Sequence, residues 1–415
     1  MCLNIKFFVI ALAFLSLNIF SVNAITVGCT DSKATNYNKV ATLNDGSCKY
    51  KETFTEPILL TQLTSEISET SGIFYHEGNL WTHNDSGDDA ILYAIDMNSG
   101  EVIQRVVIAN APAVDWEDIT LDDDYVYIGD IGNNSGNRKD LSIVKVPLSE
   151  LVNDTAYATL MYFNYMDQTD FSSQTENNDY DAEAIIALGD SLYIFTKNWK
   201  NLKSRVYALP KSFEQYTTSV VGTLSVNGLV TGADYLREEK SVILCGYNKL
   251  LQPFVYLLWD FNTPKISEGN QRKINLNLPF HQVEGVAFNN LQKLYLTNEA
   301  IANKLLKINA ALYELDASQW INSHLVEDGV LNFKEDKSIR LFPNPSTDLL
   351  NIEWNTSLRI FQIDIYNVNG KYSESWPVND IDNSLQLDIS YLKKGAYLMK
   401  LLGKNETHYK KFVKQ

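Results

Sequence analysis

One unit recurs five times between residues 54 and 335, and this repeat restricts the fold more than any other feature of the chain. In each copy a segment of small or acidic residues leads into an apolar strand. A turn and a strand rich in Tyr, Ile or Leu follow, and that strand ends in a polar cluster. The copies begin at Ser71, Asp115, Asp181, Thr231 and Val283. Their starts lie 44, 66, 50 and 52 residues apart, a spacing that suits the four-stranded blade of a β-propeller.

A third strand follows in every copy, and we predict these strands at Leu92–Ile95, Leu141–Val146, Val206–Leu209, Phe254–Leu258 and Leu305–Ile308. The fourth strand of the last copy is missing, and Pro57–Thr61, ahead of the first copy, is placed to supply it and close a ring. We therefore predict an all-β fold with a five-bladed propeller over residues 54–335. Six blades are the alternative, because the 66-residue interval is long enough for a degenerate unit. Two stacked β-sandwiches would not explain the shared ending of each unit.

Three short motifs in this stretch read HNDSG (83–87), DWED (115–118) and GDIGNN (129–134). With these signatures the repeat resembles a group of uncharacterised secreted bacterial propellers. It is distantly similar to propellers described as phytase-like or esterase-like. The resemblance implies a propeller fold, but it implies no settled activity.

Residues 1–24 are typical of a secretory signal peptide. Lys6 precedes the apolar run Phe7–Leu17, and Val22-Asn23-Ala24 offers the small residues that a signal peptidase reads. A buried N-terminal helix is the alternative. No later stretch approaches the roughly 18 apolar residues that a spanning helix requires. We expect an exported chain that begins at Ile25 and has no transmembrane segment.

Two cysteines lie close together near the start of the exported chain. In an oxidising compartment Cys29 and Cys48 can close a loop of about twenty residues, worth roughly 3 kcal/mol in the chain-entropy model. The surrounding Gly28-Cys29-Thr30-Asp31, Asn36-Tyr37-Asn38 and Asp45-Gly46-Ser47-Cys48 resemble a short GCTD…NYN…DGSC module that recurs in secreted proteins of the Bacteroidetes. We predict a disulfide-stapled module over residues 25–53. Cys245 lies in an apolar run, and we expect a buried, inert thiol.

Residues 338–415 change character, from a turn with two prolines to short alternating strands that predict a small β-sandwich. Four segments, FPNPSTDLLNIEW, IDIYNVNGKY, LDISYLKKGAYLMKL and KKFVKQ, resemble the type A sorting domain of the type IX secretion system. The resemblance implies an Ig-like sandwich that engages the secretion machinery, passage across the outer membrane and removal of this domain. The rest of the protein would then be released or attached to the cell surface. An Ig-like binding module that stays attached is the alternative.

The charge balance excludes one class of partner. The chain has 35 Lys and Arg against 51 Asp and Glu, a net charge of −16. Proteins that follow a nucleic-acid backbone need a cationic surface, so we expect no nucleic acid as a partner.

Polar residues of distant copies converge in a propeller, because the innermost strands line one channel. We expect near these strands the acids Asp115, Glu117, Asp118, Asp181, Glu183, Asp234 and Glu284. We expect at the ends of the following strands Asn84, Asp85, Asp130, Asn133, Asn134, Lys197, Asn298 and Glu299. Carboxylates so placed raise one another's pKa unless a cation lies between them. Ca²⁺ takes six to eight oxygen ligands, and we assign it to Asp115, Asp118, Asp130 and Asp181.

Three hypotheses follow for this polar set. In the first, the acids cap turns and bind backbone N–H groups between blades. In the second, Ca²⁺ is structural or bridges to a glycan or protein ligand, with Asn84, Asp85, Arg138, Asn298 and Glu299 as ligand-binding residues. In the third, Glu117, Glu183, Glu284 and Lys197 are catalytic, either in calcium-dependent hydrolysis of a phosphoester or ester or in carboxylate-pair cleavage of a glycosidic bond. Binding to an unidentified extracellular ligand is the leading expectation.

Overall fold

The computed structural model describes residues 25–85, 87–237, 240–289, 293–302, 306–321, 338–355, 358–367, 372–378, 383–403 and 407–415. The predicted signal peptide lies outside the described residues. Strands make up most of the described chain, which confirms the all-β prediction. The helical segments found there are short: η1 (Ser65–Ile67), η2 (Leu148–Val152), η3 (Ile266–Glu268) and α1 (Ser318–Ile321). None of the described helices is long and apolar enough to cross a bilayer.

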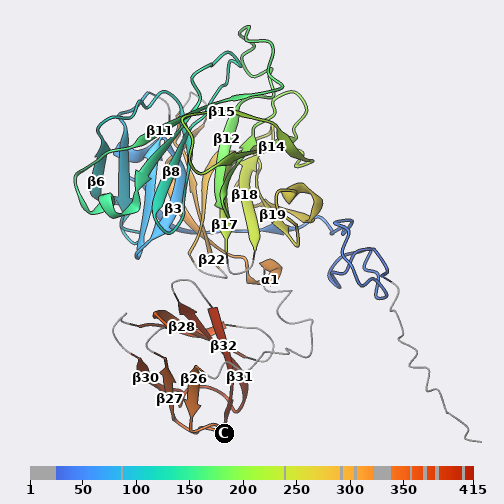
Figure 1. Ribbon diagram of the computed structural model, residues 1–415, viewed down its shortest axis with the longest axis vertical. Helices are drawn as coiled ribbons and strands as arrows, with labels where there is room; N and C mark the ends of the chain where they lie inside the picture. Colours follow the sequence, from blue (N-terminus) through green and yellow to red (C-terminus); the bar gives the residue numbers. More distant parts are fainter. Residues whose placement is uncertain are drawn as a thin grey trace, which may run out of the picture.

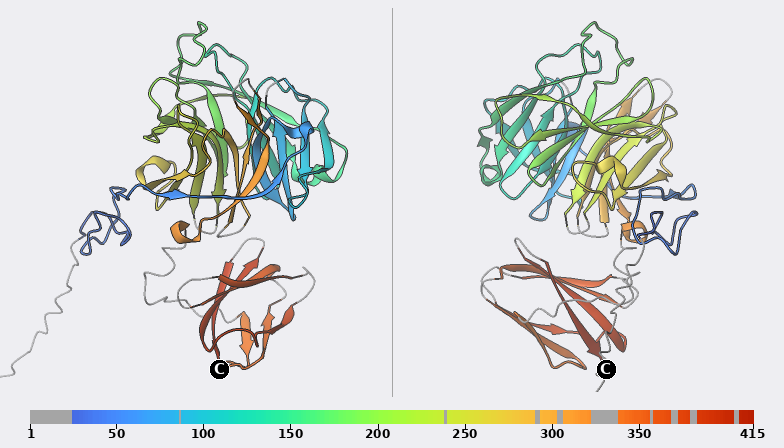
Figure 2. Two further views of the ribbon diagram at one scale, coloured as in Figure 1. Left: turned by 180° about the vertical axis from the view of Figure 1, so that it is seen from behind. Right: turned by 45° about the vertical axis from the view of Figure 1, so that its right-hand side comes forward.

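Five sheets contain most of residues 54–316 (Figures 1 and 2). The first has β3 (Thr70–His76), β4 (Asn79–Asn84), β5 (Ile91–Ile95), β6 (Val102–Ile108) and β10 (Thr155–Ala156). The second has β7 (Trp116–Leu121), β8 (Tyr125–Asp130), β9 (Ser142–Pro147), β11 (Thr159–Tyr165) and β15 (Gln215–Thr218). The third has β12 (Ala182–Leu188), β13 (Ser191–Thr196), β14 (Ser204–Pro210) and β16 (Val220–Leu224).

We call the five sheets of residues 54–316 the body, and in its last two sheets the strands again lie side by side in sequence order, apart from one strand taken from the start of the body. The fourth has β17 (Leu229–Leu236), β18 (Ser241–Tyr247), β19 (Pro253–Trp259), β20 (Asn270–Leu276) and β1 (Phe54–Thr55). The fifth has β21 (Val283–Phe288), β22 (Lys293–Asn298), β25 (Ala311–Asp316) and β2 (Ile58–Gln62). A short hairpin, β23 (Ile301–Ala302) and β24 (Lys307–Ile308), stands outside them.

The first strands of the five sheets contact one another in cyclic order, β3, β7, β12, β17, β21 and back to β3. We call this set the ring of first strands. Five apolar clusters fill the spaces between neighbouring sheets. One of them joins the fifth sheet to the first, with Tyr295 and Leu312 against Ile73 and Leu80. Alternate residues of a strand point to opposite faces, so each buried strand supplies side chains to two clusters.

The fifth sheet confirms one expectation and corrects another. The strand predicted at Pro57–Thr61 is β2, and it pairs antiparallel with β25, so the start of the body completes its last sheet. The third strand predicted at Leu305–Ile308 is wrong, because β24 pairs only with β23, whereas β25 holds the place beside β22. In the 66-residue interval, β7, β8 and β9 are followed by η2, β10, β11 and an irregular segment, and the strands belong to the first two sheets rather than to a further one.

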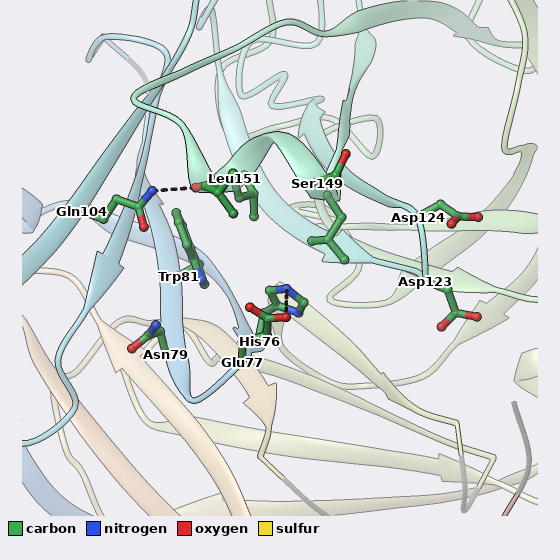
Figure 3. A pocket seen from close by; sticks show the side chains of 11 residues that line it. His76, Glu77, Asn79, Trp81, Gln104, Asp123, Asp124, Ser149 and Leu151 are labelled. Carbon is green, nitrogen blue, oxygen red and sulfur yellow. Dashed lines mark hydrogen bonds and ion pairs between the residues drawn. The ribbon is translucent and has the colours of Figure 1, made fainter. Parts of the chain in front are cut away.

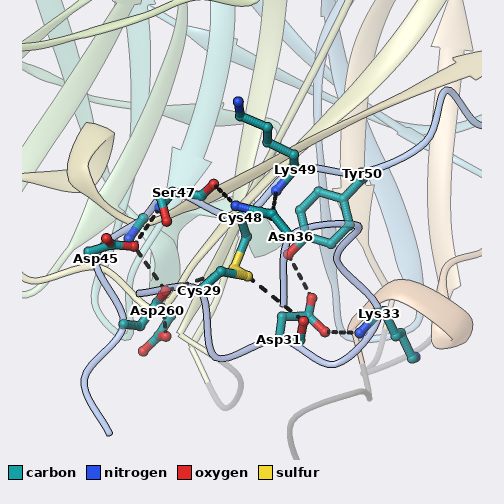
Figure 4. The surroundings of a disulfide bond; sticks show 12 residues. Cys29, Asp31, Lys33, Asn36, Asp45, Ser47, Cys48, Lys49, Tyr50 and Asp260 are labelled. Carbon is teal, nitrogen blue, oxygen red and sulfur yellow. Dashed lines mark hydrogen bonds between the residues drawn. A yellow bond between two sulfur atoms is a disulfide. The ribbon is translucent and has the colours of Figure 1, made fainter. Parts of the chain in front are cut away.

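The predicted disulfide is present between Cys29 and Cys48, whose Cα atoms are 4.8 Å apart (Figure 4). Residues 25–53, the stapled module, contact the fourth sheet. The ring centroids of Tyr50 and Trp259 are 5.6 Å apart, and Asn44 Nδ2 donates to Asp260 Oδ2 over 2.6 Å. Cys245 is buried in β18, as expected. Burial raises the pKa of its thiol.

Residues 338–415 form two antiparallel sheets around a core of their own. One sheet contains β26 (Ile339–Phe342), β27 (Leu349–Trp354) and β30 (Ser384–Asp388). The other contains β28 (Ile360–Asn367), β29 (Tyr372–Pro377), β31 (Gly395–Gly403) and β32 (Thr407–Lys414). This small β domain agrees with the predicted sandwich.

Candidate functional site

Every strand of the ring carries a β-bulge at the same point, close to its start. The register shift falls at Ser71–Gly72 in β3, Glu117 in β7, Glu183 in β12, Thr231 in β17 and Glu284 in β21. A bulge leaves one residue out of the ladder and changes the direction of its side chain. Three of the five bulges therefore re-aim a glutamate at the same end of the ring.

The second strands end at the level of these bulges. Their last residues pair with the start of the first strand of the same sheet, as in Asn84 with Thr70, Asp130 with Trp116 and Asn298 with Val283. Asp85, Lys197 and Glu299, which follow the second strands, thus reach the end where the bulged glutamates lie. The polar endings that the sequence shows as a repeat are gathered at one end of the ring.

Two groups of carboxylates are close enough to share a metal ion. One contains Asp85, Asp115 and Glu117, and the other contains Glu117, Asp181 and Glu183. In each group the candidate ligand oxygens lie within 4.8 Å of one another. Glu117 belongs to both groups. We call these five residues, with Glu284 and Glu299, the carboxylate cluster.

Burial, with repulsion from neighbouring carboxylates, raises the pKa values of six members of the carboxylate cluster, Asp115, Glu117, Asp181, Glu183, Glu284 and Glu299. Burial and the nearby Asp85 raise the pKa of Asp115 to about 6. For the same two reasons the pKa of Glu299 rises to about 7. Burial raises the pKa of Glu284 to about 8, although Lys197 opposes the shift. The pKa values of Glu117 and Glu183 lie well above their ordinary range, and burial is the largest cause in both.

Lys197 is the buried cation beside these acids. Its Nζ donates to Glu183 Oε2 over 2.8 Å and lies 5.1 Å from the ring centroid of Trp199 and 5.5 Å from that of Tyr247. The pKa of Lys197 is well above its ordinary value, because the surrounding carboxylates outweigh the effect of burial. One ammonium thus faces seven carboxylates, which leaves the cluster strongly negative whenever its acids are ionised.

Hydrogen bonds hold Asp181 in position, and the backbone at Gly132 limits the space around Glu117 and Asp115. Asp181 Oδ2 accepts from Trp199 Nε1 over 2.7 Å, and its Oδ1 accepts from the backbone N–H of Asn133 over 2.6 Å. Gly132 passes so close to the cluster that a methyl group there would overlap carboxylate oxygens of Glu117 and Asp115. The backbone of the GDIGNN segment therefore forms one wall of the cluster, and this wall requires glycine.

The structure gives three expected site residues other partners. Asp118 accepts from the backbone N–H groups of Ile185 and Ala233 over 2.9 and 3.0 Å, so its buried carboxylate ties three strands of the ring together. Asp130 forms an ion pair with Arg138, with 2.9 Å between Asp130 Oδ1 and Arg138 Nη2. Asp118 and Asp130 stand outside the two metal-distance groups. Arg138 also donates to the Gly132 carbonyl and to Asp140, so its donors are largely occupied.

Two expected ligand-binding amides lie at the same end of the ring. Asn84 and Asn298 are buried, and the side-chain oxygen of each is without a hydrogen-bond partner in the described structure. Their Nδ2 atoms donate to backbone carbonyls, of Glu66 in one case and of Glu299 and Asn309 in the other. Each amide therefore keeps an acceptor oxygen available.

The sequence did not single out the hydroxyl residues at the other two bulges. Ser71 Oγ donates to the carbonyl of Glu117, and Thr231 Oγ1 donates to the carbonyl of Val283 over 2.6 Å. Each hydroxyl thus links its strand to the next strand of the ring. Alignment of the five copies at Glu117, Glu183 and Glu284 would have pointed to these two positions.

Two cavities formed by described residues of the five-sheet region lie away from the carboxylate cluster. One of about 520 Å³ lies between the first two sheets and is lined by Glu77, Trp81, Asp123 and Asp124, among others (Figure 3). Glu77 and Asp123 lie in turns at the far ends of β3 and β7, opposite the bulges. A second cavity, of about 940 Å³, is lined by Asp190 and Arg237 at the corresponding turns of the third and fourth sheets.

Comparison with known families identifies the last domain. Residues 340–415 match the model of a secretion system C-terminal sorting domain, close to the predicted 338–415. This domain marks the protein for export through the type IX secretion system, to the cell surface or the surroundings, and implies an interaction with that machinery. The resemblances proposed for the stapled module and for the repeat stay predictions.

Comparison with whole proteins is less informative. No curated protein matches the chain. Similar solved structures include the extracellular domains of a one-component system and a hybrid two-component system from B. thetaiotaomicron, at 10% and 11% identity and TM-scores of 0.30 and 0.29. Both matches cover 87% of this chain and 59% of the other. A mitotic checkpoint complex matches at 9% identity and a TM-score of 0.29, over 59% of this chain and 63% of the other. The chain thus spans about three fifths of these structures, and such TM-scores do not establish a common fold.

Proposed function

We propose that this exported protein is a five-bladed β-propeller that binds Ca²⁺ at the carboxylate cluster and uses the ion to hold an extracellular ligand. The fold assignment is supported by five sheets, by the cyclic contacts of their first strands and by an apolar cluster between each neighbouring pair. The pairing of β2 with β25 supports closure of the ring. In a propeller of this kind the bulged glutamates lie around the mouth of the central channel.

The observation that carries the calcium assignment is the pair of metal-distance groups that share Glu117. Buried carboxylates so close together repel one another, and either protons or a cation must compensate them. Ca²⁺ prefers oxygen ligands and accepts irregular geometry with six to eight of them. Carboxylates from three sheets, with the acceptor oxygens of Asn84 and Asn298 at the same end, offer such a set.

The two groups differ in burial. The group of Asp85, Asp115 and Glu117 is the more exposed, which favours it for ligand binding. Asp85 and Asp115 are half-buried, whereas Glu117, Asp181 and Glu183 are buried and Lys197 is already bound to Glu183. An ion held by Asp85, Asp115 and Glu117 has only three carboxylates, so coordination positions are left for an outside oxygen. Hydroxyl or carboxylate groups of a glycan or a protein can fill them. The catalytic roles predicted for Glu117, Glu183 and Glu284 stay predictions.

The test is a calcium titration of the wild type and of Glu117→Gln by calorimetry and thermal unfolding. Glu117→Gln keeps the shape of the side chain and removes the charge common to both groups. We expect Ca²⁺ affinity to fall at least about tenfold, since even the outer partners of metal ligands are worth 10- to 100-fold. We also expect Tm in chelator to rise, because folding then no longer requires Glu117 either to be buried as a charge or to take up a proton.

The matched control is Glu101→Gln, which removes an exposed carboxylate elsewhere in the first sheet. It should leave both Ca²⁺ affinity and Tm unchanged. A purely structural role for Glu117 predicts a lower Tm in chelator and no calcium-dependent shift in the wild type. That result would refute the proposed calcium site.

A further inference from the structure

A second site of opposite charge lies between the stapled module and the fourth sheet. A pocket of about 780 Å³ is lined there by Cys48–Glu52 of the module, by the turn between β18 and β19 and by the exposed side of β20. Its lining contains five cations, Lys49, Lys51, Lys249, Arg272 and Lys273, and one carboxylate, Glu52. In a chain with a net charge of −16, this local excess of positive charge is unusual.

None of the five cations forms an ion pair within the described part of the chain, and the nearest acidic influence on Arg272 is that of Asp31, which accepts a hydrogen bond from Tyr50. Every ion pair found in the described part of the chain involves other cations. Lys49, Lys51 and Lys249 are exposed at the rim of the pocket. Uncompensated charges at a concave surface concentrate the field and attract anions.

Arg272 is held rigidly and keeps a free donor. Its guanidinium lies 4.9 Å from the ring centroid of Tyr50, and its Nη2 donates to Thr53 Oγ1 over 3.2 Å. Its buried Nε has no hydrogen-bond partner within the described structure. Burial lowers the pKa of Arg272. Arg272 also lines the pocket, and a planar guanidinium presented there is suited to a carboxylate or sulfate oxygen.

Lys273 adds a second fixed charge on the same strand. Its Nζ donates to the carbonyls of Val226 and Asn227 over 2.9 and 2.8 Å and lies 3.9 Å from the ring centroid of Phe254. Burial lowers its pKa to about 8, so a nearby anion would favour the charged form.

The remaining polar lining suits sugar hydroxyls. The side-chain amides of Asn227, Asn248, Gln271 and Asn275 offer both donors and acceptors around the cations. The volume is that of a site for a ligand of several rings. The net negative charge of the whole chain disfavours a long polyanion that must run across the surface, whereas a short acidic segment can enter the pocket alone.

We propose that this pocket binds an acidic polysaccharide through the sulfate or carboxylate groups of a short segment. The stapled module then has a defined part in recognition, because its disulfide fixes the start of the irregular segment that carries Lys49 and Lys51. Figure 4 shows the Lys49 side chain directed away from the disulfide. This site is separate from the carboxylate cluster and does not depend on Ca²⁺.

The test is binding of the full chain, in chelator, to dextran sulfate, polygalacturonate, neutral dextran and single-stranded DNA by calorimetry. We expect binding to dextran sulfate or polygalacturonate that weakens as salt is raised from 50 to 500 mM in the assay. The preferred polymer tells whether sulfate or carboxylate is recognised. We expect no binding to neutral dextran and much weaker binding to DNA.

The pocket variant is Lys49→Ser with Lys51→Ser and Lys249→Ser, and we expect its affinity to fall about tenfold or more, at up to about 1 kcal/mol per exposed charge. The matched control, Lys39→Ser with Lys307→Ser and Lys394→Ser, removes three exposed lysines outside the pocket and should stay within about twofold. Equal losses in both variants, binding to neutral dextran or DNA binding of equal strength would each overturn the proposal. Because all six lysines are exposed, unchanged circular dichroism should confirm that both variants fold.

Discussion

Glu284 shows how charge and burial conflict in the carboxylate cluster. Its side chain is only 8% exposed, and burial raises the pKa of its carboxyl to about 8 from an ordinary 4.5. Glu299 and Asp115 shift in the same direction, to pKa values of about 7 and 6. At neutral pH without a cation, several of these carboxyls therefore hold a proton in the folded protein that they release on unfolding.

This difference predicts how stability depends on pH. Between about pH 4.5 and 8 the folded chain binds more protons than the unfolded chain, so the free energy of unfolding falls as pH rises. We expect Tm in chelator to decrease from pH 5 to pH 8. Ca²⁺ competes with the protons for the same oxygens, so the Tm increase on adding Ca²⁺ should be larger at pH 8 than at pH 5. Thermal unfolding at several pH values checks both trends.

The variant Glu284→Gln checks whether the raised pKa of Glu284 contributes to this pH dependence of Tm. The amide cannot ionise, so the decline of Tm between pH 5 and 8 should become shallower, whereas Glu101→Gln should leave it as in the wild type. A Tm in chelator that rises over this range would contradict the assignment.

The β-bulges show where sequence reasoning reached the site and where it stopped. The repeat placed Glu117, Glu183 and Glu284 at equivalent positions, because each stands two residues ahead of a β-branched residue, Ile119, Ile185 or Val286. It could not separate Glu117 from the adjacent Asp118. Only the bulge in β7 turns Glu117 toward the cluster and leaves Asp118 bound to the backbones of β12 and β17. Bulges depend on pairing between strands, which one segment alone does not show.

The third strand of the fifth sheet was predicted wrongly for the same reason, because pairing between strands cannot be read from one segment. Leu305–Ile308 is apolar and follows β22 at the usual distance, so it fits the pattern of a strand as well as β25 does. The choice is made by β22, which pairs with β25 over the full length of both strands. The pairing of β2 with β25 was predictable, because the count of strands was one short.

Strand β2 yields a prediction about closure. Four residue pairs join it to β25, and at about 1 kcal/mol for each pair's backbone hydrogen bond its loss should cost roughly 4 kcal/mol. A chain of residues 63–321 should therefore unfold at lower urea than one of residues 57–321, which differs only by β2. The exposed edge of β25 should also make the shorter chain aggregate. Equal midpoints and equal solubility would show that β2 does not close the fifth sheet.

At the scale of the whole molecule, the C-terminal sorting domain was the easiest part to recognise from the sequence. The sorting domain was identified from four motifs in order, and the match to residues 340–415 bears this out. These motifs are contiguous in the sequence, so they can be recognised without knowledge of the fold. The carboxylate cluster depends on residues up to about 200 positions apart, and no local motif specifies it.

Export through this system predicts which residues the mature protein contains. If the sorting domain is removed at the surface, as its resemblance implies, mass spectrometry of surface or released material should give peptides from residues 25–321. It should give none from residues 340–415. Recovery of Lys400–Gln415 from that material would show that the domain is retained. A whole-cell sample, which also contains chains in transit, is the control that these peptides can be detected.

The fifth sheet takes one strand, β2, from the start of the body and three from its end. During synthesis the ring therefore stays open until β25 has been made, and the sorting domain follows soon after, from residue 340. A chain that stops early lacks both the closing strand and the export label. Every chain that presents the label to the secretion machinery therefore already contains β2 to β25, the strands that the proposed propeller needs, so the order of the chain links export to a complete set of strands.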